Sequence, residues 1–185
     1  MTRRFKELSP AEMTDAQRKV RDAIASGPRG AVRGPFNALL RSPELADRAQ
    51  KLGEYVRYNS SLPARLSELA ILVVARHWSA QYEWYAHSRL ALAAGLAPQV
   101  VEAIARGRRP EALQEDEAAV YAFCKELHEE KAVSDQAYKA ALDRFGERGV
   151  VDLLGISGYY TLVSMVLNVD RSPLPEGATP LPPLG

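Results

Sequence analysis

Cysteine is almost absent from this sequence of 185 residues, because Cys124 is the only one. A single thiol excludes a disulfide within the chain, and it also excludes a redox cycle that needs two thiols of one chain. Functions that depend on two cysteines of the same chain are therefore ruled out.

The sequence also lacks an excess of charge and a long hydrophobic run. Lys and Arg number 24 against 23 Asp and Glu, so the net charge of +1 does not point to nucleic acid or to a membrane surface as a partner. Charges interrupt the first residues, MTRRFKELSPAEMTD, and leave no apolar stretch for a signal peptide. The most apolar windows, 69–75 and 150–167, are too short or too interrupted to span a bilayer. We expect a cytoplasmic protein with no nucleic-acid or membrane partner.

Alanine and leucine recur at helical spacing, and the sequence predicts an all-α fold in a single domain. Hydrophobic residues make up 46 %, which suits one sizeable core. Ser9, Pro10 and Glu12 predict the start of a first helix that ends near Ala25. Further helices are predicted over 34–40, 43–60, 65–78, 80–94, 98–107, 112–130, 134–145 and 147–168.

Two features of this helix pattern are specific. The segment 65–78 is apolar around most of its circumference, which predicts the central buried helix. Ser79 is a candidate N-cap for the helix that follows, although 65–94 also reads as one continuous helix.

The last 15 residues, RSPLPEGATPLPPLG, hold five of the twelve prolines. Such a composition predicts an extended tail with polyproline II character, which is either disordered or wrapped around a neighbouring subunit. We therefore divide the chain into an all-α domain over 1–170 and a Pro-rich tail over 171–185.

The stretch SAQYEWYAHS, residues 79–88, carries the strongest chemical signal. Glu83 and His87 are four residues apart and lie on one face of a helix. A carboxylate beside an imidazole stabilises the protonated histidine, and a histidine poised near neutrality donates or accepts protons well. Glu68 lies in the apolar segment, where an unpaired carboxylate is costly. It needs a partner, and His87 is a candidate.

Spacing alone leaves three interpretations of these residues. The first is a structural or solvated pair, the second is an acid–base site, and the third is a metal site made by Glu68, Glu83 and His87. The metal interpretation lacks support from an HExxH pattern or a second clustered histidine, so we predict no bound metal.

These residues resemble the carboxymuconolactone decarboxylase family, which includes alkyl hydroperoxide reductase D-like peroxidases. The matching runs are GPFNALLRSPELA (34–46) and RLSELAILVVARHWSAQYEWYAHSRLALAAGL (65–96). In the redox branch of this family a glutamate is followed by Cys-x-x-Cys-x-x-x-His. On this chain the glutamate is Glu68, the histidine is His87, and the two cysteine positions fall on Ala80 and Glu83. A peroxidase of the two-cysteine type is therefore disfavoured.

The resemblance to the decarboxylase branch implies an all-helical alkyl hydroperoxide reductase D-like bundle that assembles as trimers or hexamers, with a dimer also possible. It implies decarboxylation of a small carboxylated lactone of aromatic catabolism, without metal or organic cofactor. We predict His87 as the proton donor, supported by Glu83 or Glu68. The expected substrate-binding residues are Phe36, Asn37, Tyr82, Trp84, Arg41 and Arg65.

Two other functions remain open for the same fold. The acid–base pair could serve an isomerase, hydratase or hydrolase that acts on a related lactone. The chain could also be a small-molecule binding protein without catalysis.

Overall fold

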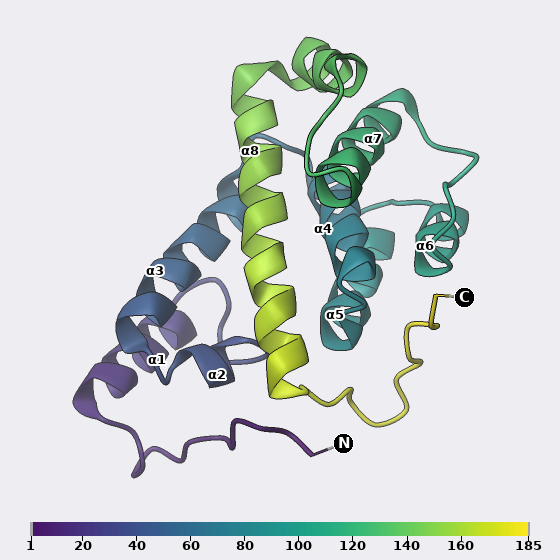
Figure 1. The fold of residues 1–185 in the computed structure, drawn as a ribbon. Coiled ribbons are helices and arrows are strands. Elements are labelled where there is room, and N and C mark those ends of the chain that lie inside the picture. Colours follow the sequence, from purple (N-terminus) through teal and green to yellow (C-terminus); the bar gives the residue numbers. More distant parts are fainter. Residues whose placement is uncertain (1, 185) are drawn as a thin grey trace.

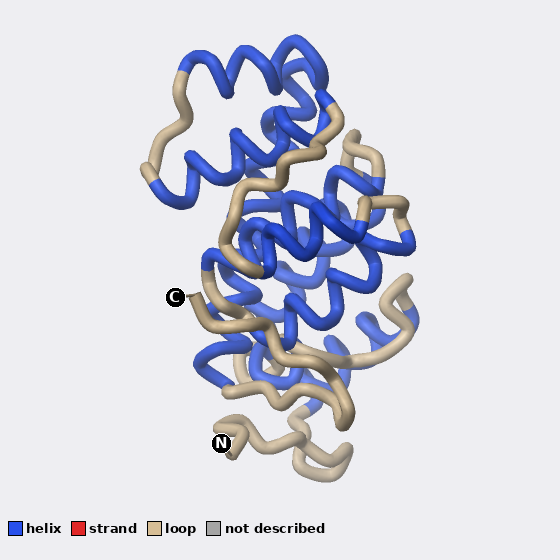
Figure 2. Tube along the Cα trace, turned by 90° about the vertical axis from the view of Figure 1, so that its right-hand side faces the viewer, coloured by secondary structure: helices blue, strands red, loops and turns tan. Residues whose placement is uncertain are grey.

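The computed structural model describes residues 2–184, and within that range every regular element is a helix (Figures 1 and 2). The all-α prediction is confirmed. The helices are α1 (Asp15–Ser26), α2 (Phe36–Leu39), α3 (Pro43–Glu54), the π-helical η1 (Tyr55–Asn59), α4 (Ala64–His77), α5 (Gln81–Ala93), α6 (Pro98–Ala105), α7 (Glu115–Glu129) and α8 (Asp135–Asp170).

Helix α4 forms the centre of the fold. It packs against α5, α7 and α8, and its buried residues run without a break from Leu66 to Arg76. A helix that is apolar around its circumference is stable only when other helices surround it, which is what the sequence predicted for 65–78. Because Glu68 lies in this helix, its carboxylate is carried into the interior of the bundle.

The first helix begins later than predicted, at Asp15 rather than Pro10. The expected Ser9–Glu12 contact does form, because the Glu12 carboxylate accepts hydrogen bonds from the backbone N–H and the hydroxyl of Ser9. This Ser9–Glu12 contact closes a single turn and does not start a longer helix. Thr14 then caps α1 in a reciprocal capping box with Gln17, so the second of two adjacent capping signals starts the helix.

Helices α4 and α5 are separate, and the interpretation of 65–94 as one continuous helix is wrong. Ser79 separates them with a φ of 47°, a left-handed conformation that no helix continues through. The N-cap of α5 is Ala80 and not Ser79. The hydroxyl of Ser79 instead accepts a hydrogen bond from the guanidinium of Arg76, at 2.6 Å. This reversal brings α5 back alongside α4.

Helix α8 contains the two predicted segments 134–145 and 147–168, which are joined at a break in the helical path. Gly146 has φ 65° and ψ 178°, a conformation that favours glycine. Beyond it the helix runs along the front of the molecule in Figure 1. By length and composition alone α8 could cross a membrane, but 56 % of its apolar window is buried in this fold, as in the core helix of a soluble protein.

The Pro-rich tail is docked on its own chain as far as residue 184, so the prediction of disorder is wrong. The side chain of Gln81 accepts from the N–H of Leu181 at 2.9 Å and donates to its C=O at 3.0 Å. The guanidinium of Arg76 donates to the carbonyl of Pro182 at 2.6 Å. The side chain of Leu181 is buried in the core. The tail therefore packs against the junction of α4 and α5.

Candidate active site

His87 lies between two carboxylates inside the bundle. Its Nδ1 is 2.7 Å from Glu68 Oε2, and its Nε2 is 2.9 Å from Glu83 Oε1. The histidine and Glu83 come from α5, whereas Glu68 comes from α4, so the turn at Ser79 is what brings the three together. All three side chains are buried.

The two carboxylates keep His87 protonated. Burial by itself would lower the pKa of His87, but Glu83 and Glu68 outweigh this effect and raise it to about 9. Both ring N–H groups therefore donate at neutral pH, one to each carboxylate. The edge of the Tyr160 ring also meets the imidazole, with the ring centroids 5.0 Å apart. The ring is fixed on three sides, so its proton can leave only towards a carboxylate.

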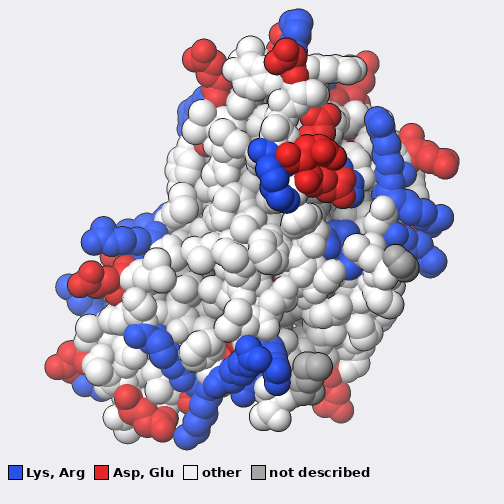
Figure 3. All heavy atoms as spheres, viewed as in Figure 1, with Lys and Arg blue, Asp and Glu red and all other residues white. Residues whose placement is uncertain are grey.

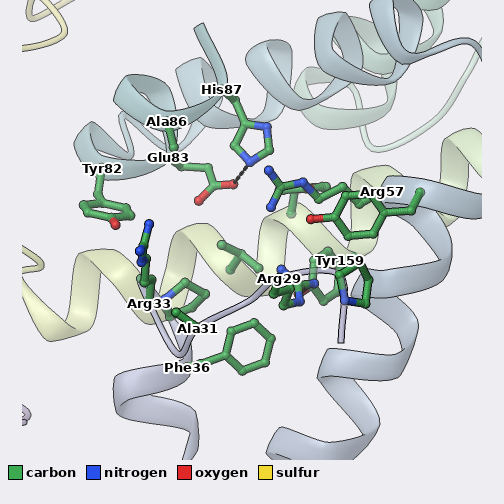
Figure 4. Close-up of a pocket in the computed structure, with 16 residues that line it drawn as sticks. Arg29, Ala31, Arg33, Phe36, Arg57, Tyr82, Glu83, Ala86, His87 and Tyr159 are labelled. Atoms are coloured by element: carbon green, nitrogen blue, oxygen red, sulfur yellow. Dashed lines mark hydrogen bonds and ion pairs between the residues drawn. The ribbon is translucent and has the colours of Figure 1, made fainter. Parts of the chain in front are cut away.

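A cavity of about 420 Å³ opens beside this histidine (Figure 4). Glu83 and His87 form part of its wall, whereas Glu68 is not among the lining residues. The volume lies within the range of sites that hold small ligands. The arrangement places the Glu83 carboxylate and the imidazole that it pairs with side by side at the cavity wall, which is a geometry for moving a proton to or from a bound molecule.

Two of the predicted substrate-binding residues line this cavity, namely Phe36 and Tyr82. Gly34 allows Tyr82 to approach the loop before α2, because a Cβ at this position would lie 3.1 Å from the tyrosine ring. Phe36 begins α2 and is almost fully buried. Both therefore contribute an aromatic ring to the cavity wall.

The other four predicted substrate-binding residues lie outside the cavity. Asn37 donates to the carbonyl of Phe5 at 2.8 Å, and Trp84 is a core residue. Arg41 donates to the carbonyls of Asn37 and Lys6. Arg65 forms ion pairs with Asp116 and Glu117 on α7. In this structure, then, the two arginines that we expected to hold a substrate carboxylate have intramolecular partners.

The cavity residues that the sequence analysis missed include Arg29, Arg33, Arg57, Tyr159 and Tyr160. One signal was available. The segment GPRGAVRGPF, residues 27–36, carries two arginines and no acidic residue, so its charges have no local partner. No comparable signal marks the tyrosines, which share the periodicity of the other buried residues of α8.

The donor groups do not converge as metal ligands do. Glu68 and Glu83 lie on opposite edges of the imidazole ring, so no single point is within reach of both carboxylates and a ring nitrogen. Among residues 2–184, no group of three His, Cys, Asp or Glu side chains is arranged to hold an ion.

Known proteins resemble this chain in sequence over part of its length and in fold over nearly all of it. The model of the "Carboxymuconolactone decarboxylase family" matches residues 43–126, a range that contains Glu68, Glu83 and His87. No curated protein sequence matches the chain.

Two solved structures have a similar fold. An alkylhydroperoxidase AhpD core, described as an uncharacterized peroxidase-related protein from Ralstonia eutropha JMP134, superposes with a TM-score of 0.75 at 14 % identity, covering 95 % of this chain and 94 % of that one. An uncharacterized peroxidase-related protein from Silicibacter sp. TM1040 gives 0.69 at 14 % identity, with 95 % and 89 % covered. At this identity the likeness shows the fold alone.

The fold is therefore that of the AhpD-like helical proteins. Within it, the resemblance to the carboxymuconolactone decarboxylase family is confirmed, and the matched segment is the one that carries the buried Glu68–His87–Glu83 group.

Proposed function

We propose that this protein is an acid–base enzyme of the carboxymuconolactone decarboxylase type, acting on a small carboxylated lactone without a metal or organic cofactor. The observation that carries the proposal is His87, held between two buried carboxylates at the wall of an open cavity. The family match over the same residues supports it.

In this proposal the His87–Glu83 pair transfers the proton, and the contact between the two side chains supports that role. In a decarboxylation, the bond from carbon to the carboxylate breaks, CO2 leaves, and the electron pair is delocalised into the lactone carbonyl. A proton must then be delivered to the carbon. Because both nitrogens of His87 are occupied, the proton reaches the substrate through Glu83, and water restores it afterwards. Glu68 keeps the imidazole oriented throughout.

Thiol peroxidase chemistry is not proposed, although the two similar structures are described as peroxidase-related. Ala80 and Glu83 occupy the positions of the two cysteines in the redox branch. Burial raises the pKa of the Cys124 thiol to about 12, with only Ser157 as a weak hydrogen-bond partner, so the reactive thiolate is scarce. Cys124 also does not line the cavity.

The test is release of CO2 from 4-carboxymuconolactone by the purified protein. We expect turnover by the wild type and by Cys124→Ser, and a loss of at least a hundredfold in kcat for Glu83→Gln and His87→Gln, which is the usual size of a general acid's contribution. Circular dichroism and a denaturation curve check that each variant is folded. No CO2 from the wild type would refute this substrate, and equal rates for Glu83→Gln would refute the mechanism.

We also propose that the protein assembles with further copies of itself through α8. This helix presents an exposed stripe that we define as Val151, Leu154, Gly158, Met165 and Val169. The residues follow helical spacing on one side of α8, and Figure 3 shows a broad band without charged side chains along the middle of this face. An exposed apolar stripe along one helix is typical of an interface between subunits.

A further inference from the structure

The proposed decarboxylation places a negative charge on an oxygen of the substrate, because the electron pair of the broken bond moves into the lactone carbonyl. Glu83 and His87 already pair with each other and serve the carbon that receives the proton. A preorganised hydrogen-bond donor aimed at the developing charge is usually the largest single contribution to catalysis. Such a donor is therefore expected elsewhere in the cavity wall.

The hydroxyl of Tyr159 is held in place at this cavity. Tyr159 belongs to α8, lines the cavity and is only 3 % exposed. Nη2 of Arg29 donates a hydrogen bond to its oxygen at 3.2 Å, and the guanidinium of Arg29 lies over the ring of Phe36, 4.8 Å from the centroid. Among the four tyrosines of the cavity wall, Tyr159 is the one whose hydroxyl a side chain within residues 2–184 fixes by a hydrogen bond.

Gly53 of α3 leaves the room for this hydroxyl. A Cβ at position 53 would overlap both the Tyr159 oxygen and Nη2 of Arg29. Because atoms in a packed interior cannot overlap, any other residue at this position would displace the pair. The backbone of α3 therefore fits closely around the contact between Arg29 and Tyr159.

The Tyr159 hydroxyl keeps its proton at neutral pH and is free to donate a hydrogen bond. Burial raises the pKa of Tyr159 above its ordinary value, Arg29 opposes this effect and Glu83 adds to it. Arg29 occupies a lone pair of the oxygen, and no acceptor for the hydroxyl hydrogen is present within residues 2–184. A hydroxyl that accepts a hydrogen bond from a guanidinium is polarised, which makes it a stronger donor.

This donor and the proton-transfer pair lie on different parts of one cavity wall. Glu83 and His87 project from α5, whereas Tyr159 projects from α8. In the view of Figure 4, Tyr159 lies below Glu83 and His87. The ring of Tyr160 meets the rings of both His87 and Tyr159 edge to face, with centroids 5.0 and 5.1 Å apart, and so sets their spacing. A bound lactone between them presents its carbon to Glu83 and its carbonyl oxygen to Tyr159.

We propose that Tyr159 is a catalytic residue whose hydroxyl donates a hydrogen bond to the oxygen that becomes negative during decarboxylation. The bond from carbon to the carboxylate breaks, CO2 leaves, and the electron pair forms an enolate. The hydroxyl stabilises the enolate oxygen and keeps its own proton. Glu83 then protonates the carbon and the carbonyl forms again. Arg29 is a positioning residue, because it acts through Tyr159. This inference rests on the proposed function, but its first test needs no turnover.

The first test uses 4-nitrophenol as a probe, because the charged oxygen of its phenolate resembles that of an enolate. The phenolate absorbs at a longer wavelength than the phenol, so absorbance against pH gives the pKa of the bound probe. We expect this pKa to be lower by about one unit on the wild type than on Tyr159→Phe, a tenfold preference for the phenolate. The variant loses only the hydroxyl. 4-Nitroanisole, which cannot ionise, should bind both proteins equally.

The second test is turnover of 4-carboxymuconolactone. Tyr159→Phe should lower kcat about a hundredfold and change KM less than about twofold, because the hydrogen bond strengthens only in the transition state. Tyr138→Phe is the matched control and should change neither, since Tyr138 lies on the same helix, is 44 % exposed and does not line the cavity. Gly53→Ala displaces the hydroxyl without removing it and should reproduce the loss, so the test stays valid if Tyr159→Phe is unfolded.

Two results would overturn the proposal. A bound probe with the same pKa on the wild type and on Tyr159→Phe would show that the hydroxyl does not meet the charged oxygen. A loss in Tyr160→Phe without one in Tyr159→Phe would assign the donor to the neighbouring tyrosine.

The inference and the proposed function fail separately. A probe pKa that depends on Tyr159, without release of CO2 from 4-carboxymuconolactone, would refute the decarboxylase and leave a site for a negatively charged oxygen. Release of CO2 with the same kcat in the wild type and in Tyr159→Phe would refute the role of Tyr159 and leave the decarboxylase standing.

Discussion

At the scale of single residues, His87 links the folding of this protein to pH. Its pKa is about 9 in the folded chain and about 6.5 in an unfolded one. A raised pKa means that the stabilisation is fully present below about pH 6.5 and is lost as the pH rises through 9. The difference corresponds to roughly 3 kcal/mol.

We therefore expect the free energy of unfolding of the wild type to fall more steeply than that of His87→Gln between pH 6 and pH 10, by roughly 3 kcal/mol. Urea denaturation at intervals across this range measures both curves. The variant removes the imidazole and keeps Glu68, Glu83 and Tyr160. Parallel curves would mean that His87 is not protonated in the folded protein.

At the scale of elements, the docked tail buries one side chain, that of Leu181, in the core. Leu181 is 3 % exposed, whereas Leu184 in the same tail is 53 % exposed. We expect Leu181→Ala to lower the free energy of unfolding by about 2 kcal/mol, because a buried leucine loses its contacts. Leu184→Ala should change it by less than 1 kcal/mol. Urea denaturation measures both, and brief proteolysis with mass spectrometry shows whether residues 173–184 have detached. Similar losses in the two variants would contradict the anchoring role of Leu181.

Helices with a clear hydrophobic pattern could be predicted from the sequence. The site residues that lie on those helices, Glu68, Glu83 and His87, could be predicted with them. The continuous apolar run of α4 predicted a buried helix, and a carboxylate inside it, Glu68, required a partner. The arginine cluster could not be predicted in this way. Arg29 and Arg57 reach one cavity because Gly53 leaves space and because α3 ends in a π-helical turn. Neither of these two features leaves a periodic pattern in the sequence from which it could be predicted.

The sequence also could not show which of two neighbouring helix-capping patterns starts a helix. Ser9 and Thr14 both carry capping patterns, and only tertiary packing decides that the helix starts after Thr14. Ser79 has the composition of a cap, but Arg76 binds its hydroxyl and the backbone there turns left-handed. Arg41 and Arg65 resembled ligand-binding arginines until their partners, which are distant in sequence, were visible.

At the scale of the whole molecule, the α8 stripe predicts the state of assembly. We expect the wild type to contain more than one chain at micromolar concentration, and Leu154→Lys with Met165→Lys to be monomeric, because charge at the centre of an apolar interface is not tolerated. Leu92→Lys, on α5, is the matched control at an exposed leucine. Size-exclusion chromatography with light scattering measures the mass. A wild type that stays monomeric across a wide concentration range would contradict the prediction.

Some contacts of the segment around Phe5 are made with the end of the last helix. The carboxylate of Asp170 accepts from the backbone N–H of Phe5 at 2.9 Å and from Arg3 at 2.9 Å, and the carbonyl of Asp170 accepts from the N–H of Arg4 at 2.8 Å. On a ribosome that adds 5–20 residues per second, about 10–30 s pass between the synthesis of these partners. Residues 3–5 therefore wait for Asp170, and closing this contact is expected to be a late step of folding in the cell.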